Sequence, residues 1–385
     1  MPPKDPRPQL RSLTGLRFIA ALQVVVFHCS HWRDWSVWRP LRDAAGAGYV
    51  AVSLFFVLSG FILTYAHAAA GAPDLDRRAF YTNRFARIYP AYAFALLLGA
   101  PLFIGHSLRL FGARTTLQQA TAVVLLLQAY FPSMALAWNP PGWSLSVEAF
   151  FYLLFPFVAP RLTRCRGSIA LAVAAASYAV CLLLPLAYVA IAPDAPVPPV
   201  FDSDAPWLNA LRYDPVARFP EFVIGIVAGR WYLDMGAPRE SARWSLPAAA
   251  ALVVIVAALG GSSLISYPVL HNGLLAPGFA LLIVGLASGG GGAFARLLAT
   301  RPFVALGDAS YSLYVLHVPL LILWSKATIK IAGGRFYGTS SWTVSFMALA
   351  VGASLLCHRF IERPGLAFTR AVLGGRRSLA APRLG

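Results

Sequence analysis

The sequence predicts an all-α protein that crosses a membrane many times. Hydrophobic residues make up 58% of its 385 residues and charged residues only 12%, a composition typical of polytopic helical membrane proteins. Long apolar runs recur along the whole chain, and no stretch is polar enough to form a sizeable soluble domain. We therefore expect one membrane domain at 12–364, preceded by a basic cytoplasmic leader at 1–11 and followed by a basic cytoplasmic tail at 365–385.

Eleven apolar runs are candidates for the membrane crossings. Each is long enough, at about 1.5 Å per residue, to form most or all of a helix across the hydrocarbon core. They lie at 13–31, 48–67, 88–105, 116–131, 144–160, 168–192, 215–234, 246–262, 272–289, 305–325 and 342–361.

The charge of the loops reduces this number to ten crossings. Basic loops of membrane proteins face the cytoplasm, whereas eleven separate crossings would put the basic segment 161–166 and the basic tail outside. If 116–131 and 144–160 instead form one crossing, broken near 131–143, the basic loops and both termini face the cytoplasm. The acidic loop at 194–214 then faces outward. We expect about ten transmembrane helices, one of them broken.

Charge and cysteine content exclude two other classes of site. The formal net charge of +17 could indicate nucleic-acid binding, but the Lys and Arg residues lie in short loops between apolar runs. That placement is what membrane orientation requires, so we expect no nucleic-acid partner. The four cysteines have neither metal-ligand spacing nor a disulfide framework, and we expect no metal site.

Arg17 and His28 lie inside the first apolar run. Their separation of eleven positions is close to three helical turns, so they share one helix face about 16 Å apart along the axis. Ionisable side chains inside membrane helices are costly and are candidates for functional sites. The alternative is that Arg17 reaches toward lipid phosphates while His28 caps the far end of the helix.

The predicted break is informative because lipid offers no partners to freed backbone groups, which must line a cavity or be buried against protein. The break ends in Pro140-Pro141-Gly142, after which Ser144 is a candidate N-cap and Glu148 lies one turn further on. A carboxylate at this depth is expected to face the bundle interior and to pair with a cation or stay protonated. The alternative is a capping carboxylate near the membrane surface.

Arg84 and Arg87 lie in the loop after the second apolar run. Residues three apart are neighbours on one helix face, and two forked guanidiniums on one face suit phosphate oxygens. The alternative is that both arginines only orient the protein in the membrane. Further upstream, Ser59 and Gly60 end an apolar motif that begins at Phe55. Small residues let membrane helices approach closely, so we expect a helix-packing contact there.

Seven short motifs follow one another along the chain. They are Arg17 with His28, Phe55-Phe-Val-Leu-Ser-Gly60, Arg84-x-x-Arg87 with Pro90, Trp143-Ser-Leu-Ser-Val-Glu148, Arg218-Phe-Pro-Glu-Phe-x-x-Gly225, Tyr311-Ser-Leu-Tyr-Val-Leu-His317 and Glu362-Arg-Pro364. In this order the chain resembles the acyltransferase family 3 membrane proteins, which O-acylate carbohydrates and other acceptors. The resemblance extends from about residue 12 to 364. It implies a multi-pass protein of the bacterial inner (cytoplasmic) membrane.

The resemblance also implies roles for several residues. The histidine that matches His28 is the expected catalytic base of that family, and the arginines that match Arg17, Arg84 and Arg87 are expected to serve the acyl-CoA end. We expect acyl-CoA, with acetyl-CoA as the expected form, to be the donor substrate, and we expect no bound cofactor.

The residues fit this chemistry without the resemblance. Acyl-CoA is phosphorylated and cytoplasmic, so its phosphates suit the basic inner mouth, and its slender arm could carry a thioester toward His28. There the imidazole could either remove a proton from an acceptor hydroxyl or take the acyl group itself before transfer. The oxyanion needs a stabilising donor, for which Ser144 and the Trp143 N–H group are candidates. Glu148 completes the catalytic candidates.

Three more residues are candidates for an acceptor cavity: Glu221, His317 and Tyr311. His317 has an alternative role as a hydrogen-bonded histidine of the bundle. The expected acceptor is a carbohydrate or lipid-linked sugar, such as exopolysaccharide or lipopolysaccharide, and a small secondary metabolite is an alternative. A transporter or flippase for a glycolipid or metabolite is the main rival, because broken helices and buried charges are also transporter features. The lack of an internal repeat matching the broken segment argues against it.

Overall fold

A computed structural model describes residues 9–29, 38–67, 75–236, 244–289, 292–332, 334 and 336–373. All regular structure within these ranges is helical, and they contain no strand. Most of the predicted leader, and the predicted tail beyond residue 373, lie outside the described residues.

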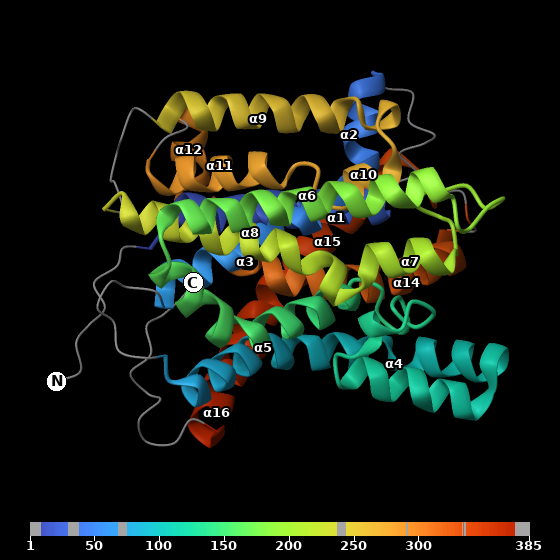
Figure 1. The fold of residues 1–385 in the computed structure, drawn as a ribbon. Helices are drawn as coiled ribbons and strands as arrows, with labels where there is room; N and C mark the ends of the chain where they lie inside the picture. The colour runs from blue at the N-terminus through green and yellow to red at the C-terminus, as the bar shows by residue number, and fades with distance from the viewer. Residues whose placement is uncertain are drawn as a thin grey trace.

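The helices follow one another as a bundle of long apolar elements joined by short ones (Figure 1). They are α1 (Arg11–Cys29), α2 (Arg39–Gly46), α3 (Ala51–His67), α4 (Arg77–Val124), α5 (Gly142–Arg164), α6 (Gly167–Ile191), α7 (Pro206–Tyr213), α8 (Pro215–Asp234), α9 (Ser245–Gly260), α10 (Tyr267–His271), α11 (Ala276–Ala287), α12 (Gly292–Leu298), α13 (Arg301–Asp308), α14 (Ser310–Ala332), α15 (Ser340–Cys357) and α16 (Arg363–Leu373). A π-helical segment, His358–Glu362, joins α15 to α16.

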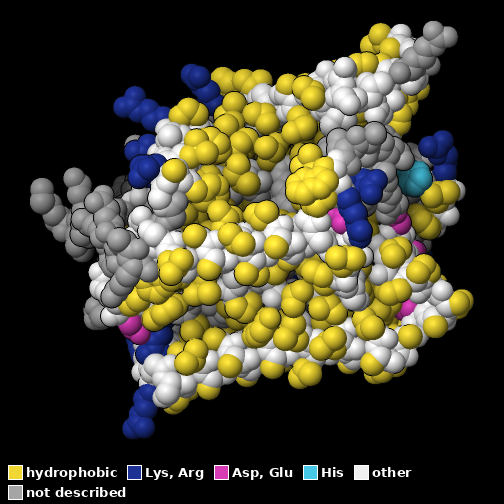
Figure 2. Space-filling view, turned by 90° about the horizontal axis from the view of Figure 1, so that it is seen from above, with side chains coloured by type: hydrophobic (Ala, Val, Ile, Leu, Met, Phe, Trp, Pro, Cys, Tyr) yellow, Lys and Arg dark blue, Asp and Glu magenta, His cyan; other side chains and the backbone are white. Residues whose placement is uncertain are grey.

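Eight helical segments of the described chain are long and apolar enough to cross a membrane. Two further predicted crossings coincide with α9, which is shorter, and with α8, which carries four charged side chains. Figure 2 shows the matching surface, a broad hydrophobic band with Lys and Arg side chains gathered toward its two ends. The predicted all-helical, multi-pass membrane architecture is confirmed.

The structure confirms a break before α5. Residues 125–141 are non-helical apart from one 3-10 turn. Within α4 the chain turns at Gly112, whose φ of 75° favours glycine. Residues 113–124 then fold back along the helix as the hairpin seen in Figure 1, where Ser107 donates to Oε1 of Gln119 over 2.9 Å. The reversal at Gly112 separates the predicted runs 88–105 and 116–131, and the break that follows lies where the sequence predicts it, near 131–143.

Two buried amide groups of the break donate to protein carbonyls, which supply partners that lipid lacks. Gln128 and Asn139 are both 1% exposed. The amide of Gln128 donates to the carbonyl of Gly142 over 2.8 Å, and that of Asn139 donates to the carbonyl of Val315 over 3.0 Å. These bonds fix the start of α5 against α14, where two of the predicted motifs meet.

The expected packing contact at Gly60 is present, between α3 and α8. A Cβ atom added to Gly60 would lie 2.2 Å from the carbonyl oxygen of Phe222. One added to Gly225 would lie 2.0 Å from the carbonyl oxygen of Val57. Because neither position has room for a side chain, the two backbones touch, and this contact holds α8 against the helix that lines the site.

One end of the bundle brings together the start of α1, the end of α3, the start of α4 and α16. Residues from all four segments (Leu10, Ala66, Arg84 and Leu366) line one cavity. The loop charges assign this end to the cytoplasm, and we call it the predicted cytoplasmic end.

Candidate active site

A cavity of about 280 Å³ extends from the predicted cytoplasmic end into the bundle, between α1, α3, α4, α5, α14 and α16. Six of the ten predicted site residues line it: Arg17, Arg84, Arg87, Ser144, Glu148 and Tyr311. The other four, His28, Trp143, Glu221 and His317, lie outside its lining. The sequence motifs therefore meet in space. Their residues divide into a group that lines the cavity and a group that lies outside it.

Three arginines form the basic part of the cavity. Arg84 approaches the ring of Phe80 and the ring of Tyr152, each at 5.9 Å from the ring centroid. Arg87 forms an ion pair with Glu362, which is 1% exposed. Within the described chain neither Arg17 nor Arg84 forms an ion pair, so both keep guanidinium donors available for a ligand.

The carboxylate of Glu148 lies among these cations and is held from its own helix. Tyr152, one turn further along α5, donates its hydroxyl to Glu148 over 3.2 Å. Ser59 of α3 donates to the Tyr152 hydroxyl over 3.4 Å. Glu148 thus faces the bundle interior, as its position in the sequence predicts.

The deep end of the cavity is closed by Tyr314 and Ser144. Their hydroxyl oxygens are 2.8 Å apart, and both residues line the cavity while remaining largely buried. The Ser144 hydroxyl also lies 3.0 Å from the carbonyl of Pro141, in the break. Nearer the entrance, Tyr311 donates its hydroxyl to the carbonyl of Ile88 over 2.6 Å, which connects α14 to α4.

His28 and His317 lie together, one helical turn beyond Tyr314. Nε2 of His317 is 3.4 Å from Nδ1 of His28, and the two ring centroids are 5.0 Å apart. The ring of Tyr314 is 6.0 Å from that of His317. The cavity and the histidine pair are thus separated by one aromatic side chain.

The hydrogen bonds around the two histidines select a tautomer for each ring. Nδ1 of His317 is 2.7 Å from the carbonyl oxygen of Tyr314, which can only accept, so this nitrogen carries the proton and Nε2 is an acceptor. Nδ1 of His28 then faces two acceptors, this Nε2 atom and the carbonyl of Val24 at 2.9 Å. The proton of His28 is therefore held on Nδ1, and its Nε2 keeps a free lone pair.

Trp143 packs away from the cavity. Its ring lies 4.9 Å from that of Tyr213 and stacks at 6.2 Å on that of His271, and its backbone N–H bonds to the carbonyl of Pro140 over 3.3 Å. Trp143 supports the start of α5 in this arrangement.

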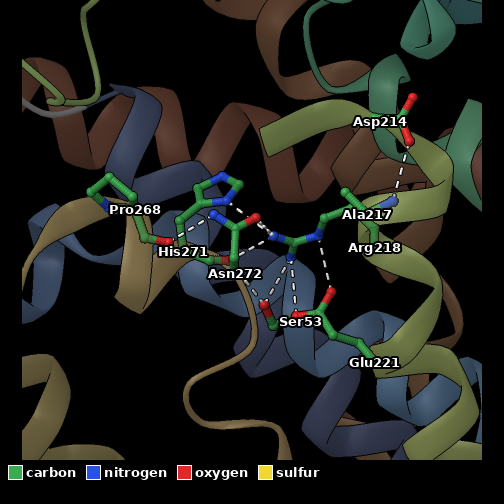
Figure 3. A network of polar contacts seen from close by, with 8 residues as sticks. All are labelled: Ser53, Asp214, Ala217, Arg218, Glu221, Pro268, His271 and Asn272. Carbon is green, nitrogen blue, oxygen red and sulfur yellow. Dashed lines mark hydrogen bonds and ion pairs between the residues drawn. The ribbon is translucent and has the colours of Figure 1, made fainter. Parts of the chain in front are cut away.

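Glu221 belongs to a buried network around Arg218 (Figure 3). The two side chains are 1% exposed and form an ion pair at 2.9 Å. Arg218 also donates to the carbonyl of His271 and to Oδ1 of Asn272, each over 2.7 Å, and to the hydroxyl of Ser53 over 3.0 Å. The network connects α8 to α3 and to the segment after α10, apart from the cavity that holds the arginines.

Two aromatic side chains lie beside His28, Phe27 of α1 and Phe201 of the predicted outer loop. Phe201 lies 4.5 Å from the ring of Phe27 and 6.4 Å from that of His28. Arg212 of α7 holds this loop by donating to the carbonyl oxygens of Phe201 and Ser203, each over 2.9 Å. His28 therefore lies one aromatic side chain from the basic cavity and beside an aromatic residue of the predicted outer loop.

Three residues of the site were not predicted: Tyr152, Tyr314 and Arg370, which also lines the cavity. Tyr314 could have been found from the sequence, because it precedes His317 by three positions and so lies on the same helix face. Tyr152 follows Glu148 by four positions, so the sequence could likewise have placed the two residues on one helix face. Arg370 lies in the predicted tail, where nothing in the sequence distinguishes it from an orienting charge.

Comparison with known proteins finds a family model and several relatives that match most of the chain. The family described as "Acyltransferase domain" matches residues 10–359. Acyltransferase MdmB of Streptomyces mycarofaciens is 29% identical, with 99% of this chain and 96% of MdmB covered. Exopolysaccharide production protein ExoZ of Rhizobium meliloti is 29% identical over 87% of this chain and 95% of ExoZ. O-acetyltransferase OatA of Staphylococcus aureus is 21% identical over 92% of this chain and 57% of OatA. No solved structure matches the chain.

Proposed function

This chain belongs to the acyltransferase domain family, and we propose on that premise that it transfers an acetyl group from acetyl-CoA to a hydroxyl group of a carbohydrate acceptor. The observation that carries the proposal is the His28–His317 pair, placed one helical turn beyond the deep end of an arginine-lined cavity. We place the cavity mouth on the cytoplasmic side of a bacterial inner membrane. A cytoplasmic donor and an exported acceptor would then approach His28 from opposite sides.

The cavity fits the chemistry of the donor. CoA carries a 3′-phosphate and a diphosphate, which suit the unpaired guanidiniums of Arg17 and Arg84. Its narrow pantetheine arm would extend inward, past Tyr311, to the pair formed by Tyr314 and Ser144. The thioester meets Tyr314 before it reaches His28, so the Tyr314 side chain controls how far the acyl group advances.

His28 supplies the proton transfer. Its Nε2 lone pair takes the proton of the acceptor hydroxyl as the hydroxyl oxygen attacks the thioester carbonyl. The C–S bond then breaks, the thiolate of CoA takes the proton from the imidazolium, and the acyl group remains on the acceptor as an ester. The hydroxyls of Ser144 and Tyr314, 2.8 Å apart at the deep end of the cavity, are the candidate donors for the oxyanion. Transfer through an acyl group on Nε2 is the second route, and a burst of CoA release without acceptor would identify it.

Two observations support a carbohydrate acceptor. Relatives of this chain are named for exopolysaccharide production and for O-acetyl transfer. Phe27 and Phe201 lie beside His28, and aromatic faces suit the apolar face of a sugar ring.

The test is acetyl transfer by the purified protein. With radiolabelled acetyl-CoA and extracted exopolysaccharide or lipopolysaccharide, we expect labelled glycan and free CoA from the wild type. His28→Ala should lower the rate by about 10² or more, the usual size of general-base assistance, without changing yield or melting temperature. His106→Ala, at an exposed histidine of α4, is the control. A wild-type protein that neither hydrolyses acetyl-CoA nor transfers its acyl group would overturn the proposal in favour of a transporter. A His28→Ala protein that keeps more than about a tenth of the rate would remove His28 from the chemistry.

A further inference from the structure

The cavity contains more positive charge than the described protein neutralises. Four arginines line it: Arg17, Arg84, Arg87 and Arg370. Arg87 is paired with Glu362, and Glu148 is the one carboxylate among the described lining residues. Like charges in a partly buried space repel one another more strongly than in water. An arrangement of this kind favours an anionic ligand with several charges.

Arg370 reaches the cavity because α16 packs closely on α4. A Cβ atom on Gly365 would lie 2.5 Å from Cβ of Pro90, so the two helices can touch at this point only with glycine there. Leu366 and Arg370 follow on one face of α16, four positions apart, and both line the cavity. The start of the predicted tail is therefore a wall of the site.

Comparison with a second arginine of α16 shows that Arg370 does not lie at the cavity merely to orient the protein in the membrane. Arg363 is exposed and lines no described cavity. Arg370 is half-buried, and its Nε atom is buried with no hydrogen-bond partner in the described chain. A charge that only orients the protein can stay in water, whereas a buried donor without a partner is unfavourable.

We propose that Arg370 binds a phosphate group of the donor nucleotide, and that α16 is the wall against which the nucleotide lies. The proposal rests on the proposed function, because acyl-CoA is its ligand. A guanidinium presents donors that match two phosphate oxygens at once. Arg84 and Arg370 approach from different helices, so they can hold the phosphates from two directions. Arg370 thereby favours CoA thioesters over pantetheine thioesters, which lack the nucleotide.

The experiment measures ligand affinity by calorimetry, with the full chain in phosphatidylcholine nanodiscs. The ligands are CoA, 3′-dephospho-CoA and pantetheine. Arg370→Ala should weaken CoA binding about ten- to a hundred-fold, the effect of losing one charge-assisted hydrogen bond, and should leave pantetheine binding unchanged. Binding of 3′-dephospho-CoA shows which phosphate Arg370 binds. If Arg370 binds the 3′-phosphate, Arg370→Ala should not weaken 3′-dephospho-CoA binding. If Arg370 binds the diphosphate, the variant should weaken it as much as it weakens CoA binding. Arg363→Ala removes the same charge from the same helix and should have no effect.

Several outcomes would overturn the proposal. Equal CoA affinity in Arg370→Ala and wild type would remove Arg370 from the site while leaving the proposed function intact. Equal weakening of CoA and pantetheine would mean that α16 is only a structural wall. An effect that requires phosphatidylglycerol in the nanodiscs would assign Arg370 to a lipid phosphate. If Arg370→Ala does not fold, Arg370→Lys replaces it. Lysine keeps the positive charge but lacks the paired donors of the guanidinium. Unchanged CoA affinity in Arg370→Lys would contradict binding of two phosphate oxygens by Arg370. A wild type that binds no CoA would instead defeat the proposed function.

Discussion

His317 places its Nε2 atom 3.4 Å from Nδ1 of His28, although 289 positions separate the two residues in the sequence. The Tyr314 carbonyl keeps the His317 proton on Nδ1, and His317 together with the Val24 carbonyl keeps the His28 proton on Nδ1. The nitrogen left with a lone pair is Nε2 of His28. His317 is therefore a positioning residue for the proposed base.

Replacing His317 tests this relationship. His317→Phe removes one of the two acceptors that face Nδ1 of His28 and keeps a ring, so we expect kcat to fall roughly 2- to 10-fold, the size of one neutral hydrogen bond. KM for acetyl-CoA should stay the same, because His317 does not line the donor cavity. His317→Gln restores an acceptor oxygen and should recover part of the loss. A change in KM alone, or equal kcat in the wild type and the Phe variant, would contradict the positioning role.

Tyr314 should limit the length of the acyl group. Its ring closes the deep end of the cavity, so Tyr314→Ala should admit longer chains. Butyryl has two more methylene groups than acetyl, each contributing about 0.8 kcal/mol when buried, so the ratio of kcat/KM for butyryl-CoA over acetyl-CoA should rise roughly ten-fold. Tyr314→Phe keeps the ring and should keep the wild-type ratio. An unchanged ratio in the Ala variant would place the acyl group elsewhere.

Much of this arrangement was predictable because it depends on local spacing. Hydropathy and loop charge locate the helices, since a membrane tolerates few other structures. The three-residue spacing of Arg84 and Arg87 places both on one face of α4, and both line the cavity with Arg17. Glu148 lies one turn after the break, and this local spacing likewise predicts that it faces the bundle interior.

What could not be predicted depends on contacts between segments far apart in the sequence. Glu221 looks available for a ligand until packing brings His271 and Asn272 to its partner Arg218. The gap between the predicted runs 88–105 and 116–131 contains the turn at Gly112, but hydropathy does not show that α4 begins as early as Arg77, in the basic segment 77–87. Arg370 has no candidate site residue three or four positions away, so nothing in its spacing distinguishes it from the other basic residues of the tail.

Arg84 and Arg17 should differ in how they affect donors of different length. Arg84→Ala should weaken acetyl-CoA about ten- to a hundred-fold by removing a charge-assisted bond to phosphate, and should have little effect on acetyl-pantetheine. Arg17 lies within the span of α1, beside the path of the thioester arm, so Arg17→Ala should weaken both donors. KM values for the two donors provide the measurement. Arg78→Ala, at an exposed position of α4, is the control, and equal effects of all three variants on both donors would indicate an orienting role only.

Arg87 should matter for stability as well as for the donor, because it neutralises Glu362. That carboxylate is 1% exposed and also accepts from Ser312 over 2.6 Å. Breaking a buried pair by removing one partner is strongly destabilising, so Arg87→Ala should lower the melting temperature more than Arg84→Ala does. Arg87→Ala combined with Glu362→Gln removes both charges and should recover part of the loss. If the double variant melts below the single one, the two side chains do not act as a pair.

The ten-crossing topology can be tested by labelling two loops that flank α6. Gly167 begins this helix and is exposed, and Ser203 lies in the loop that follows it and is partly exposed. Because α6 has 25 residues, enough to span the hydrocarbon core at about 1.5 Å per residue, cysteines at the two sites should react from opposite sides of the membrane. A charged maleimide added to intact cells should modify Ser203→Cys and should reach Gly167→Cys only after the membrane is permeabilised. Native Cys165 lies two positions before Gly167, so both variants are made with Cys165→Ser, and that background alone should remain unlabelled from outside. Labelling of both introduced cysteines in intact cells would rule out the ten-crossing topology and the cytoplasmic position of the donor cavity.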